Sequence, residues 1–359
     1  MFSLSKSKYL AGVQCLKLLW FHYNAKERFP PVDETTQLIF DQGHEVGMLA
    51  RQRFPDGIEI TSEHNALSEV DRLSREALKS RKPLYEAGFI AGNVFARADI
   101  LNPVRGDKWD IIEVKSGTSV KDVNLDDLTF QHHVYEQAGL RIHKSLILHI
   151  NSQYVRRGDI DAKHLFSLED MSDEVEKRLP AVPKNVARMV KAIGGAKFPE
   201  IPIGPHCNDP YGCSLTEICW KNVPERSVFT LTRSGKKAFE WFHGGYRRLT
   251  DLAQHVVLSR NQQVQVRATV RGRPFVDREA VRSFLASLEH PLYYLDFETC
   301  YAAIPLFNHS RPYQQIPFQF SLHVVERPGA KPCHHLFLAD DAADPREKFI
   351  MQLKPLLGA

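Results

Sequence analysis

Three residues in one stretch of the chain have the types and spacing of a metal-dependent hydrolytic site. Asp99 is followed by turn residues 102–108 and then by Glu113 and Lys115, in the order D-x13-E-x-K. Carboxylate oxygens suit Mg²⁺ or Mn²⁺, and such an ion lowers the pKa of a bound water. A neighbouring lysine can orient that water or stabilise charge on a phosphate. The pattern predicts a hydrolytic site, although a plain surface pair of Glu113 and Lys115 has the same spacing.

The elements around these residues predict a mixed α/β layer. Strands are expected over residues 89–101 and 109–115, because two apolar runs flank a turn that contains proline and glycine. Side chains two apart on a strand share a face, so the glutamate and the lysine should project together. A helix over 125–139 and an apolar strand over 144–151 follow. This strand–strand–helix–strand order is typical of α/β domains.

The next helix adds two polar residues to the pattern. Gln131 and Tyr135 stand four apart and so share one helix face. The order Asp99, Glu113-x-Lys115, Gln131-x3-Tyr135 resembles the RecB-type branch of the PD-(D/E)XK nucleases. The resemblance implies a restriction-endonuclease-like mixed-sheet core. It also implies that the two carboxylates hold the metal, that the lysine assists the attacking water, and that the glutamine and tyrosine position the strand or the lysine.

An upstream histidine extends the same resemblance. Residues 34–54 have the spacing of a helix, and His44 lies on it within the segment QGHEVG. The family places a metal-binding histidine on a helix at about this position, which makes His44 a further expected ligand. The spacing between glycine and histidine departs from the family pattern, and a lone helix histidine is commonly a surface or core residue.

Four cysteines form a second group with metal-binding character. Cys15 lies on a helix expected over residues 4–23, and Cys207, Cys213 and Cys219 follow as C-x5-C-x5-C. Thiolates bind zinc or iron–sulfur clusters, but zinc sites favour short C-x2–4-C knuckles, which these five-residue gaps do not match. The spacing therefore fits zinc poorly and is compatible with a [4Fe–4S] cluster, with four unrelated buried cysteines as the bland alternative.

The order of these cysteines resembles the iron–sulfur RecB-type nucleases. One cysteine precedes the nuclease motifs and three follow them, as in the CRISPR-associated adaptation nuclease and the AddB-type subunit of a bacterial helicase–nuclease. The resemblance covers residues 1–222, including a long helix expected over 168–193. It implies that the cluster is structural and fastens the N-terminal helix to the end of the domain.

The remaining chain divides into a connector and the start of a second domain. Residues 223–288 are expected to form a helical connector, ending in a helix over 277–288. In residues 289–359, Asp296 and Glu298 lie two apart on an expected strand. This D-x-E resembles the first motif of DnaQ-like exonucleases with an RNase H-like α/β fold, which implies two further metal ligands. Further acidic motifs are missing, so we expect this domain to be truncated and its site incomplete.

Composition places few limits on function. The chain has 359 residues, a formal net charge of +4 and six cysteines. No run of about 18 apolar residues is present, and the N-terminus lacks the apolar core of a signal peptide. We therefore expect a cytoplasmic protein without membrane contact, whose cysteines are not paired as disulfides.

Together these observations predict a Mg²⁺- or Mn²⁺-dependent DNA nuclease that carries a structural [4Fe–4S] cluster. The expected reaction is hydrolysis of phosphodiester bonds in single strands or at ends, in DNA repair, recombination or defence. A helicase or other repair protein is a possible partner. Two alternatives stay open: a non-catalytic iron–sulfur module that binds DNA or protein, and an exonuclease that uses Asp296 and Glu298 with motifs supplied in trans.

Overall fold

The structure is a computed structural model that describes residues 3–61, 66–253 and 257–358. It contains two compact units, each built from separated parts of the chain. Unit 1 comprises residues 1–10, 31–190 and 289–359, and unit 2 comprises residues 11–30 and 191–288. The grouping differs from the division expected at residue 222, because the cysteine-rich segment groups with the connector.

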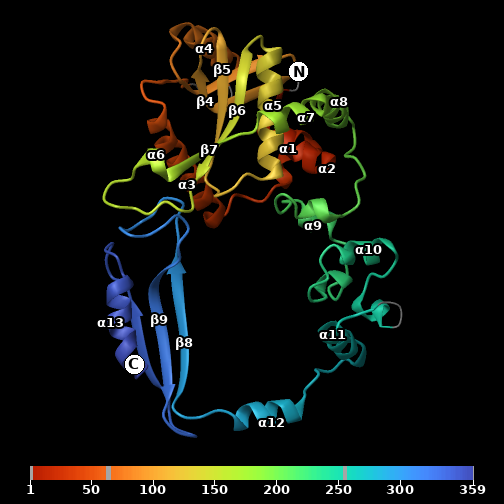
Figure 1. Ribbon diagram of the computed structural model, residues 1–359. Coiled ribbons are helices and arrows are strands. Elements are labelled where there is room, and N and C mark those ends of the chain that lie inside the picture. The colour runs from red at the N-terminus through yellow and green to blue at the C-terminus, as the bar shows by residue number, and fades with distance from the viewer. Residues whose placement is uncertain (1–2, 62–65, 254–256, 359) are drawn as a thin grey trace. The chain divides into compact units, whose positions relative to one another are not determined.

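A large mixed sheet is the centre of unit 1 (Figure 1). Its main path runs β2-β3-β4-β5-β6-β7, and β1 joins by parallel pairing with β4. β5 and β6 are parallel, whereas β4 is antiparallel to both β3 and β5. The expected mixed α/β class is therefore confirmed. The strands are β1 (Leu4–Ser5), β2 (Ile58–Glu59), β3 (Leu84–Ala91), β4 (Val94–Pro103), β5 (Lys108–Lys115), β6 (Arg141–Ile150) and β7 (Phe166–Asp170).

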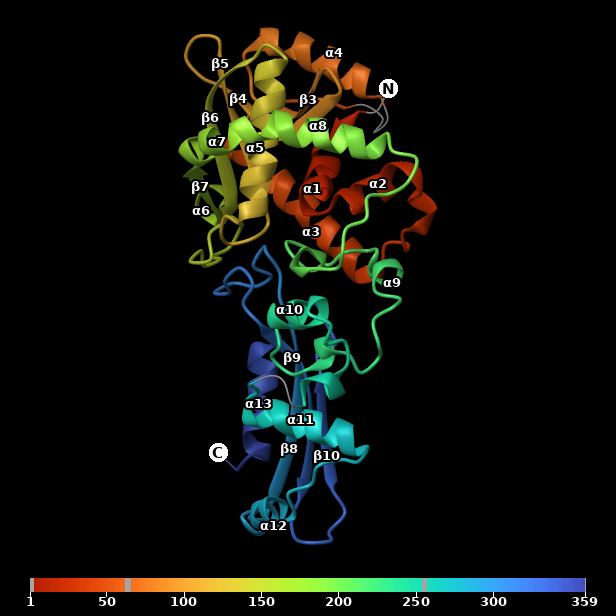
Figure 2. The ribbon, with the colours of Figure 1, turned by 90° about the vertical axis from the view of Figure 1, so that its right-hand side faces the viewer.

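Helix α5 (Asp122–Gln137) lies across one face of this sheet (Figures 1 and 2). Phe130 of α5 stacks on the buried ring of Tyr9 with 4.3 Å between ring centroids. This contact fixes the start of the chain against α5. Such an aromatic pair contributes about 0.5–1.5 kcal/mol beyond its buried area. The other helices near the sheet are α1 (Lys6–Gln14), α3 (Glu34–Ala50), α4 (Leu67–Ala77), α6 (Ala162–Leu165), α7 (Ser172–Arg178) and α8 (Val182–Ile193).

A smaller antiparallel sheet forms the C-terminal part of unit 1. Its order is β10-β9-β8, with bounds β8 (Leu292–Cys300), β9 (Ile316–Val325) and β10 (Cys333–Leu338). Helix α13 (Arg346–Leu356) packs on one face through Phe349, which contacts Phe320 and Phe337 (Figure 1). In the loop of residues 301–313, the Tyr313 hydroxyl donates a hydrogen bond to the Ser116 carbonyl at 2.6 Å.

Unit 2 is built from short helices around two apolar clusters. One cluster contains Leu18, Phe21 and Leu215, and the other contains Val228, Leu252 and their neighbours. The α-helices are α2 (Leu16–Asn24), α9 (Thr216–Cys219), α10 (Lys237–His243), α11 (Arg260–Arg271) and α12 (Arg278–Ala286). Within the described residues, no helix is both long enough and apolar enough to cross a membrane.

Three expected elements are wrong in detail. The helix expected over 4–23 is interrupted at Cys15, whose backbone is extended (φ −162°, ψ 121°). The strand expected over 89–101 is two strands, because Gly92 adopts a left-handed φ of 62° and turns the chain. The helix expected over 168–193 begins instead with strand β7. In each case apolar residues continue on both sides of the break, so their spacing alone did not reveal it.

Candidate functional site

Strand pairing brings Asp99 beside Glu113. β4 and β5 pair with Ile100 opposite Ile112, and one further step of the same register places the aspartate opposite the glutamate. Asp99 Oδ2 accepts a hydrogen bond of 2.6 Å from the Val114 amide, which fixes its carboxylate beside β5. The two carboxylates predicted from the hairpin therefore do converge.

Glu113 is buried and neutralised by two lysines. Its side chain is 2% exposed, and Oε1 receives Lys115 Nζ at 2.7 Å and Lys6 Nζ at 2.8 Å. The contact with Lys115 confirms that the two residues project from the same face of β5. Lys6 comes from the start of α1, immediately after β1 pairs with β4, and sequence reasoning missed it.

Helix α5 supplies two more side chains to this group. Gln131 Nε2 donates to Glu113 Oε2 at 2.7 Å and to Asp127 Oδ1 at 2.9 Å. Asp127 in turn accepts from Lys115 Nζ at 2.7 Å and was also missed by sequence reasoning. We call Lys6, Asp99, Glu113, Lys115 and Asp127 the carboxylate–lysine cluster. Gln131 lies within it, as expected.

Tyr135 lies beside the cluster rather than in it. Its hydroxyl donates to the Ala87 carbonyl at 2.6 Å and accepts from the Ala98 amide at 2.7 Å. The side chain is fully buried, and burial is the main cause that raises its pKa. Tyr135 thus ties β3 to β4 one residue before Asp99, which makes it a positioning residue for the strand.

His44 lines the same cavity as Asp99. This cavity of about 140 Å³ is bordered by residues of α3, β3, β4 and β5, including His44, Arg51, Glu86 and Asp99. Glu86 was not expected at the site. It stands between the paired residues Tyr85 and Ala87, and it has a left-handed φ of 58°, a backbone conformation that non-glycine residues rarely adopt.

The buried charges shift one another's pKa values in opposite directions. Burial raises the pKa of Asp99 to about 7; Glu113 adds to the rise, and Lys6 and Lys115 oppose it. Burial alone would also raise the pKa of Glu113, but Lys115 and Lys6 outweigh it and hold that pKa well below its usual range. Burial is likewise the main cause of a raised pKa at Asp127. The two lysines therefore favour the ionised form of Glu113, whereas burial favours the protonated form of Asp99.

The donor set has the oxygen chemistry that magnesium and manganese prefer. Mg²⁺ uses one or two carboxylates and keeps several waters, so Asp99 and Glu113 would be sufficient protein ligands. The buried Gln131 Oε1 has no hydrogen-bond partner among the described residues and can accept from a water. Across residues 3–61, 66–253 and 257–358, no group of three or more His, Cys, Asp and Glu residues is arranged to hold a metal ion. In the cluster itself, Lys6 and Lys115 contact Glu113 directly.

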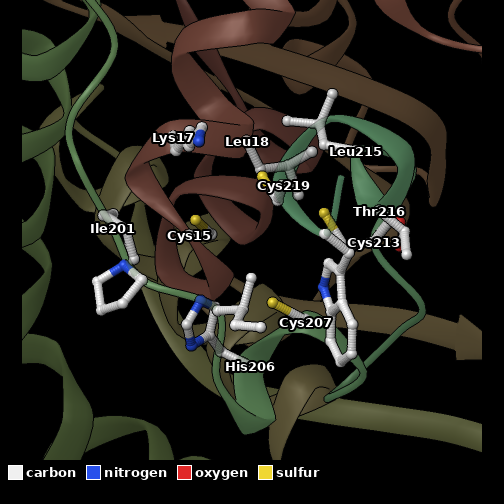
Figure 3. Close-up of a pocket in the computed structure, with 13 residues that line it drawn as sticks. Cys15, Lys17, Leu18, Ile201, His206, Cys207, Cys213, Leu215, Thr216 and Cys219 are labelled. Carbon is white, nitrogen blue, oxygen red and sulfur yellow. The ribbon is translucent and has the colours of Figure 1, made fainter. Parts of the chain in front are cut away.

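The four predicted cysteines line one pocket in unit 2 (Figure 3). Cys15 reaches it from the break between α1 and α2, and Cys207, Cys213 and Cys219 reach it from the 205–219 segment. The Cys213 amide donates to the Cys207 carbonyl at 2.8 Å, which folds the segment back on itself. We call these four residues and the space between them the cysteine pocket.

The thiols in this pocket influence one another. Burial raises the pKa of Cys15, backbone hydrogen bonds lower it, and Cys207 and Cys219 raise it further. Burial also raises the pKa of Cys213, and the other three cysteines add to that rise. The four sulfur-bearing side chains line one pocket, and all four are free cysteines.

The lining of the cysteine pocket combines the four thiols with apolar walls from Leu18, Ile203 and Leu215. Its cavity of about 20 Å³ has room for about one water molecule, so a [4Fe–4S] cluster would require the pocket to widen. Trp220 also lines it, and its buried Nε1 has no hydrogen-bond partner among the described residues. Donors aimed at sulfur tune iron–sulfur clusters, so this N–H fits such a ligand.

Asp296 and Glu298 lie apart from the carboxylate–lysine cluster, on β8 of the small sheet. They pair in register with Ser321 and Gln319 of β9, and both are exposed. Neither belongs to a metal-binding group within the described part of the chain.

Comparisons with known proteins address only the C-terminal segment. A family described as a domain of unknown function (DUF2779) matches residues 293–359, which contain Asp296, Glu298 and helix α13. No curated protein and no solved structure shows significant similarity to the chain.

Of the site residues that sequence reasoning missed, only one could have been found from a pattern in the sequence. Asp127 stands four residues before Gln131, so it shares the helix face that was already singled out. No pattern in the sequence indicates Glu86 or Lys6. The position of Glu86 at the site depends on strand pairing, and Lys6 lies 107 residues before its partner Glu113.

Proposed function

We propose that this chain is a Mg²⁺- or Mn²⁺-dependent DNA nuclease with a restriction-endonuclease-like core of the RecB type. The observation that carries the proposal is the convergence of Asp99, Glu113 and Lys115 with Gln131 from the next helix. Burying Glu113 and Asp127, with Asp99 and two lysines half-buried beside them, costs considerable desolvation free energy. Such groups of perturbed charges are concentrated at functional sites.

Each residue has a distinct role in this proposal. Asp99 and Glu113 would hold the ion, which supplies an activated water and neutralises charge on the phosphate. Lys115 stands beside Glu113 and would donate hydrogen bonds to the reacting phosphate and water. Asp127 and Gln131 keep Lys115 and Glu113 in place. His44 lies on the wall shared with Asp99, so it is the candidate for a further ligand.

The cysteine pocket would hold a structural [4Fe–4S] cluster. Four thiols from two distant segments, 11–30 and 191–222, meet there, and the cluster would fasten these segments together as in iron–sulfur RecB-type nucleases. Bound metal stabilises only the folded state, so ligation contributes directly to folding free energy. Residues 289–359 would form a DnaQ-like segment that does not itself catalyse.

A nuclease assay with paired variants tests the proposal. Full-length protein, Asp99→Ala and Lys115→Ala are incubated with a labelled single-stranded oligodeoxynucleotide and Mg²⁺ or Mn²⁺. We expect each substitution to reduce the cleavage rate by about 10²–10³-fold or more, because each removes charge stabilisation made at the reacting phosphate. Circular dichroism should show an unchanged secondary-structure content.

Matched controls come from exposed charges outside the cluster. Asp107→Ala and Lys144→Ala remove surface ion pairs with Arg141 and Asp170, and both variants should retain full activity. The competing function is a non-catalytic iron–sulfur module that binds DNA or protein, which the existing neutralisation of Glu113 by two lysines favours. Wild-type rates in both cluster variants would reject the nuclease assignment at this site.

A further inference from the structure

One face of helix α11 anchors it to the rest of unit 2. Gln262 Nε2 donates to the Thr232 carbonyl at 2.9 Å, and Gln265 accepts from the Thr232 amide at 2.9 Å. Val266 is buried in the apolar cluster that contains Leu252. With about 100° between successive residues, these three side chains define one side of the helix.

The opposite side of α11 is a row of arginines. Arg260, Arg267 and Arg271 are separated by seven and four residues, so they share a face, and all three are exposed. The helix ends at Gly272, whose left-handed φ of 63° turns the chain. This turn brings Arg273 next to the arginines of the helix.

These residues form a groove, which we call the arginine groove. Its cavity is about 430 Å³, and its lining includes Arg267, Arg271, Arg273, Arg278 and Phe275. The Phe275 side chain is 60% exposed. An exposed aromatic side chain between arginines offers a stacking surface beside a positive channel.

The positive charge of the groove is not balanced internally. Residues 260–282 contain six arginines and two acidic residues. Within the part of the chain that the structure describes, none of the four groove arginines forms a side-chain hydrogen bond or an ion pair. One of the acidic residues, Asp277, instead caps α12 by accepting from the Ala280 amide at 3.0 Å. The unbalanced positive charge of the arginine groove therefore favours binding of an anionic ligand.

We propose that the arginine groove binds the phosphate backbone of single-stranded DNA. Guanidinium groups match phosphate geometry bidentately, and base stacking on Phe275 would suit an unpaired strand. A membrane surface fits less well, because interfacial helices present an apolar face opposite their basic face. In α11 that face carries Gln262 and Gln265, which are committed to the 230–232 segment. The choice of DNA among polyanions rests on the proposed nuclease function.

Binding measurements without metal separate this inference from catalysis. Fluorescence anisotropy of a labelled oligo(dT) of about 30 nucleotides is followed in EDTA at several KCl concentrations, with the full chain. The test variant combines Arg267→Ala, Arg271→Ala, Arg273→Ala and Arg278→Ala. We expect about tenfold or greater weakening at 0.1 M salt, and a salt dependence shallower by about 2–3 in the logarithmic slope, since each single-strand phosphate contact contributes about 0.7.

Two control variants show whether the loss is specific. Replacing the same four arginines with lysine retains the charge and should retain most of the salt slope. A charge-matched set on unit 1, Arg72→Ala, Arg141→Ala, Lys144→Ala and Lys177→Ala, removes exposed cations that already have acidic partners and should bind like wild type.

Each outcome either supports or overturns the proposal that the arginine groove binds single-stranded DNA. Wild-type affinity and slope in the alanine variant, or an equal loss in the matched set, would overturn the inference. Failure of the wild-type protein to bind the oligonucleotide, with binding instead to phosphatidylserine vesicles, would do so too. Binding that depends on the groove in a protein that never cleaves would support the inference while rejecting the nuclease function. Cleavage by the protein together with unchanged binding in the alanine variant would support the nuclease function while overturning the inference about the groove.

Discussion

The carboxylate–lysine cluster and the cysteine pocket accommodate their ionisable side chains in opposite ways. In the cluster, Glu113 is 2% exposed and has two lysines within 2.8 Å. In the cysteine pocket, the thiols are surrounded by apolar walls, and burial raises the pKa of Cys15 and of Cys213. The first site therefore carries its own counter-charges, whereas the second favours neutral thiols.

This difference predicts that the carboxylate–lysine cluster can form without its proposed ligand, whereas the cysteine pocket would depend on one. Internal ion pairs let the cluster remain folded with Glu113 ionised, and breaking one partner of such a pair is costly. Thiols must lose their protons to bind metal, so the cysteine pocket would release protons on binding the proposed cluster. Removal of metal should therefore perturb the two sites to very different extents.

The largest expected effect of a single substitution on stability lies in the cysteine pocket. Cys207→Ser should remove most of the bound iron and the brown absorbance, and lower the melting temperature by about 10 °C or more, because ligation free energy is folding free energy. Iron analysis, visible spectroscopy and thermal unfolding of anaerobically purified protein check this. Cys300→Ser, outside the pocket, should change none of them. Full absorbance and an unchanged melting temperature in Cys207→Ser would contradict the structural role.

Local spacing accounts for most of what the sequence predicted correctly. Glu113 and Lys115 project together because alternate residues of a strand share a face, and their 2.7 Å contact bears this out. Gln131 reaches Glu113 because the helix after the hairpin packs on the same sheet. The four cysteines line one pocket, as their order along the chain suggested.

Contacts between distant segments account for what the sequence did not give. Lys6 reaches Glu113 only because β1 pairs with β4, a pairing of two residues without a detectable pattern. The break at Cys15 was hidden because α2 continues the apolar spacing through Leu18 and Leu19. Strand β7 was read as helix, since its five residues alternate too briefly to establish a period.

The second prediction tests whether the internal counter-charges compete with a metal ion. Lys6→Met removes one of the two cations on Glu113 Oε1, so the carboxylate becomes more available. We expect Mn²⁺ to bind about 5–10-fold more tightly, while stability in EDTA falls by about 1 kcal/mol or more, because a buried carboxylate loses a partner. Isothermal titration calorimetry and denaturant unfolding measure the two effects.

Lys144→Met is the matched control for this test, because it removes a lysine whose ion pair with Asp170 lies on the surface. It should leave both Mn²⁺ affinity and stability nearly unchanged. Weaker Mn²⁺ binding in Lys6→Met than in the control would show that Lys6 supports the metal site instead of competing for it.

The smallest expected effect concerns the proton on Asp99. Its pKa is raised from 3.8 to about 7 on folding, mainly by burial. Between these values only the folded state binds the proton, so the free energy of unfolding falls as pH rises from about 4 to 7 and is lowest above 7. Asp99→Asn keeps an acceptor for the Val114 amide but removes the titration. In EDTA, its melting temperature relative to wild type should rise by about 2 °C or more between pH 5 and pH 8.

Asp107→Asn provides the contrast, because its exposed carboxylate is paired with Arg141, which lowers its pKa. Its melting temperature relative to wild type should not rise over the same interval. A pH-independent difference between Asp99→Asn and wild type would mean that Asp99 is already ionised at pH 5 and fully balanced by the lysines. If the rise is observed, the cluster holds an excess of negative charge above pH 7, and that excess is what a divalent cation would neutralise.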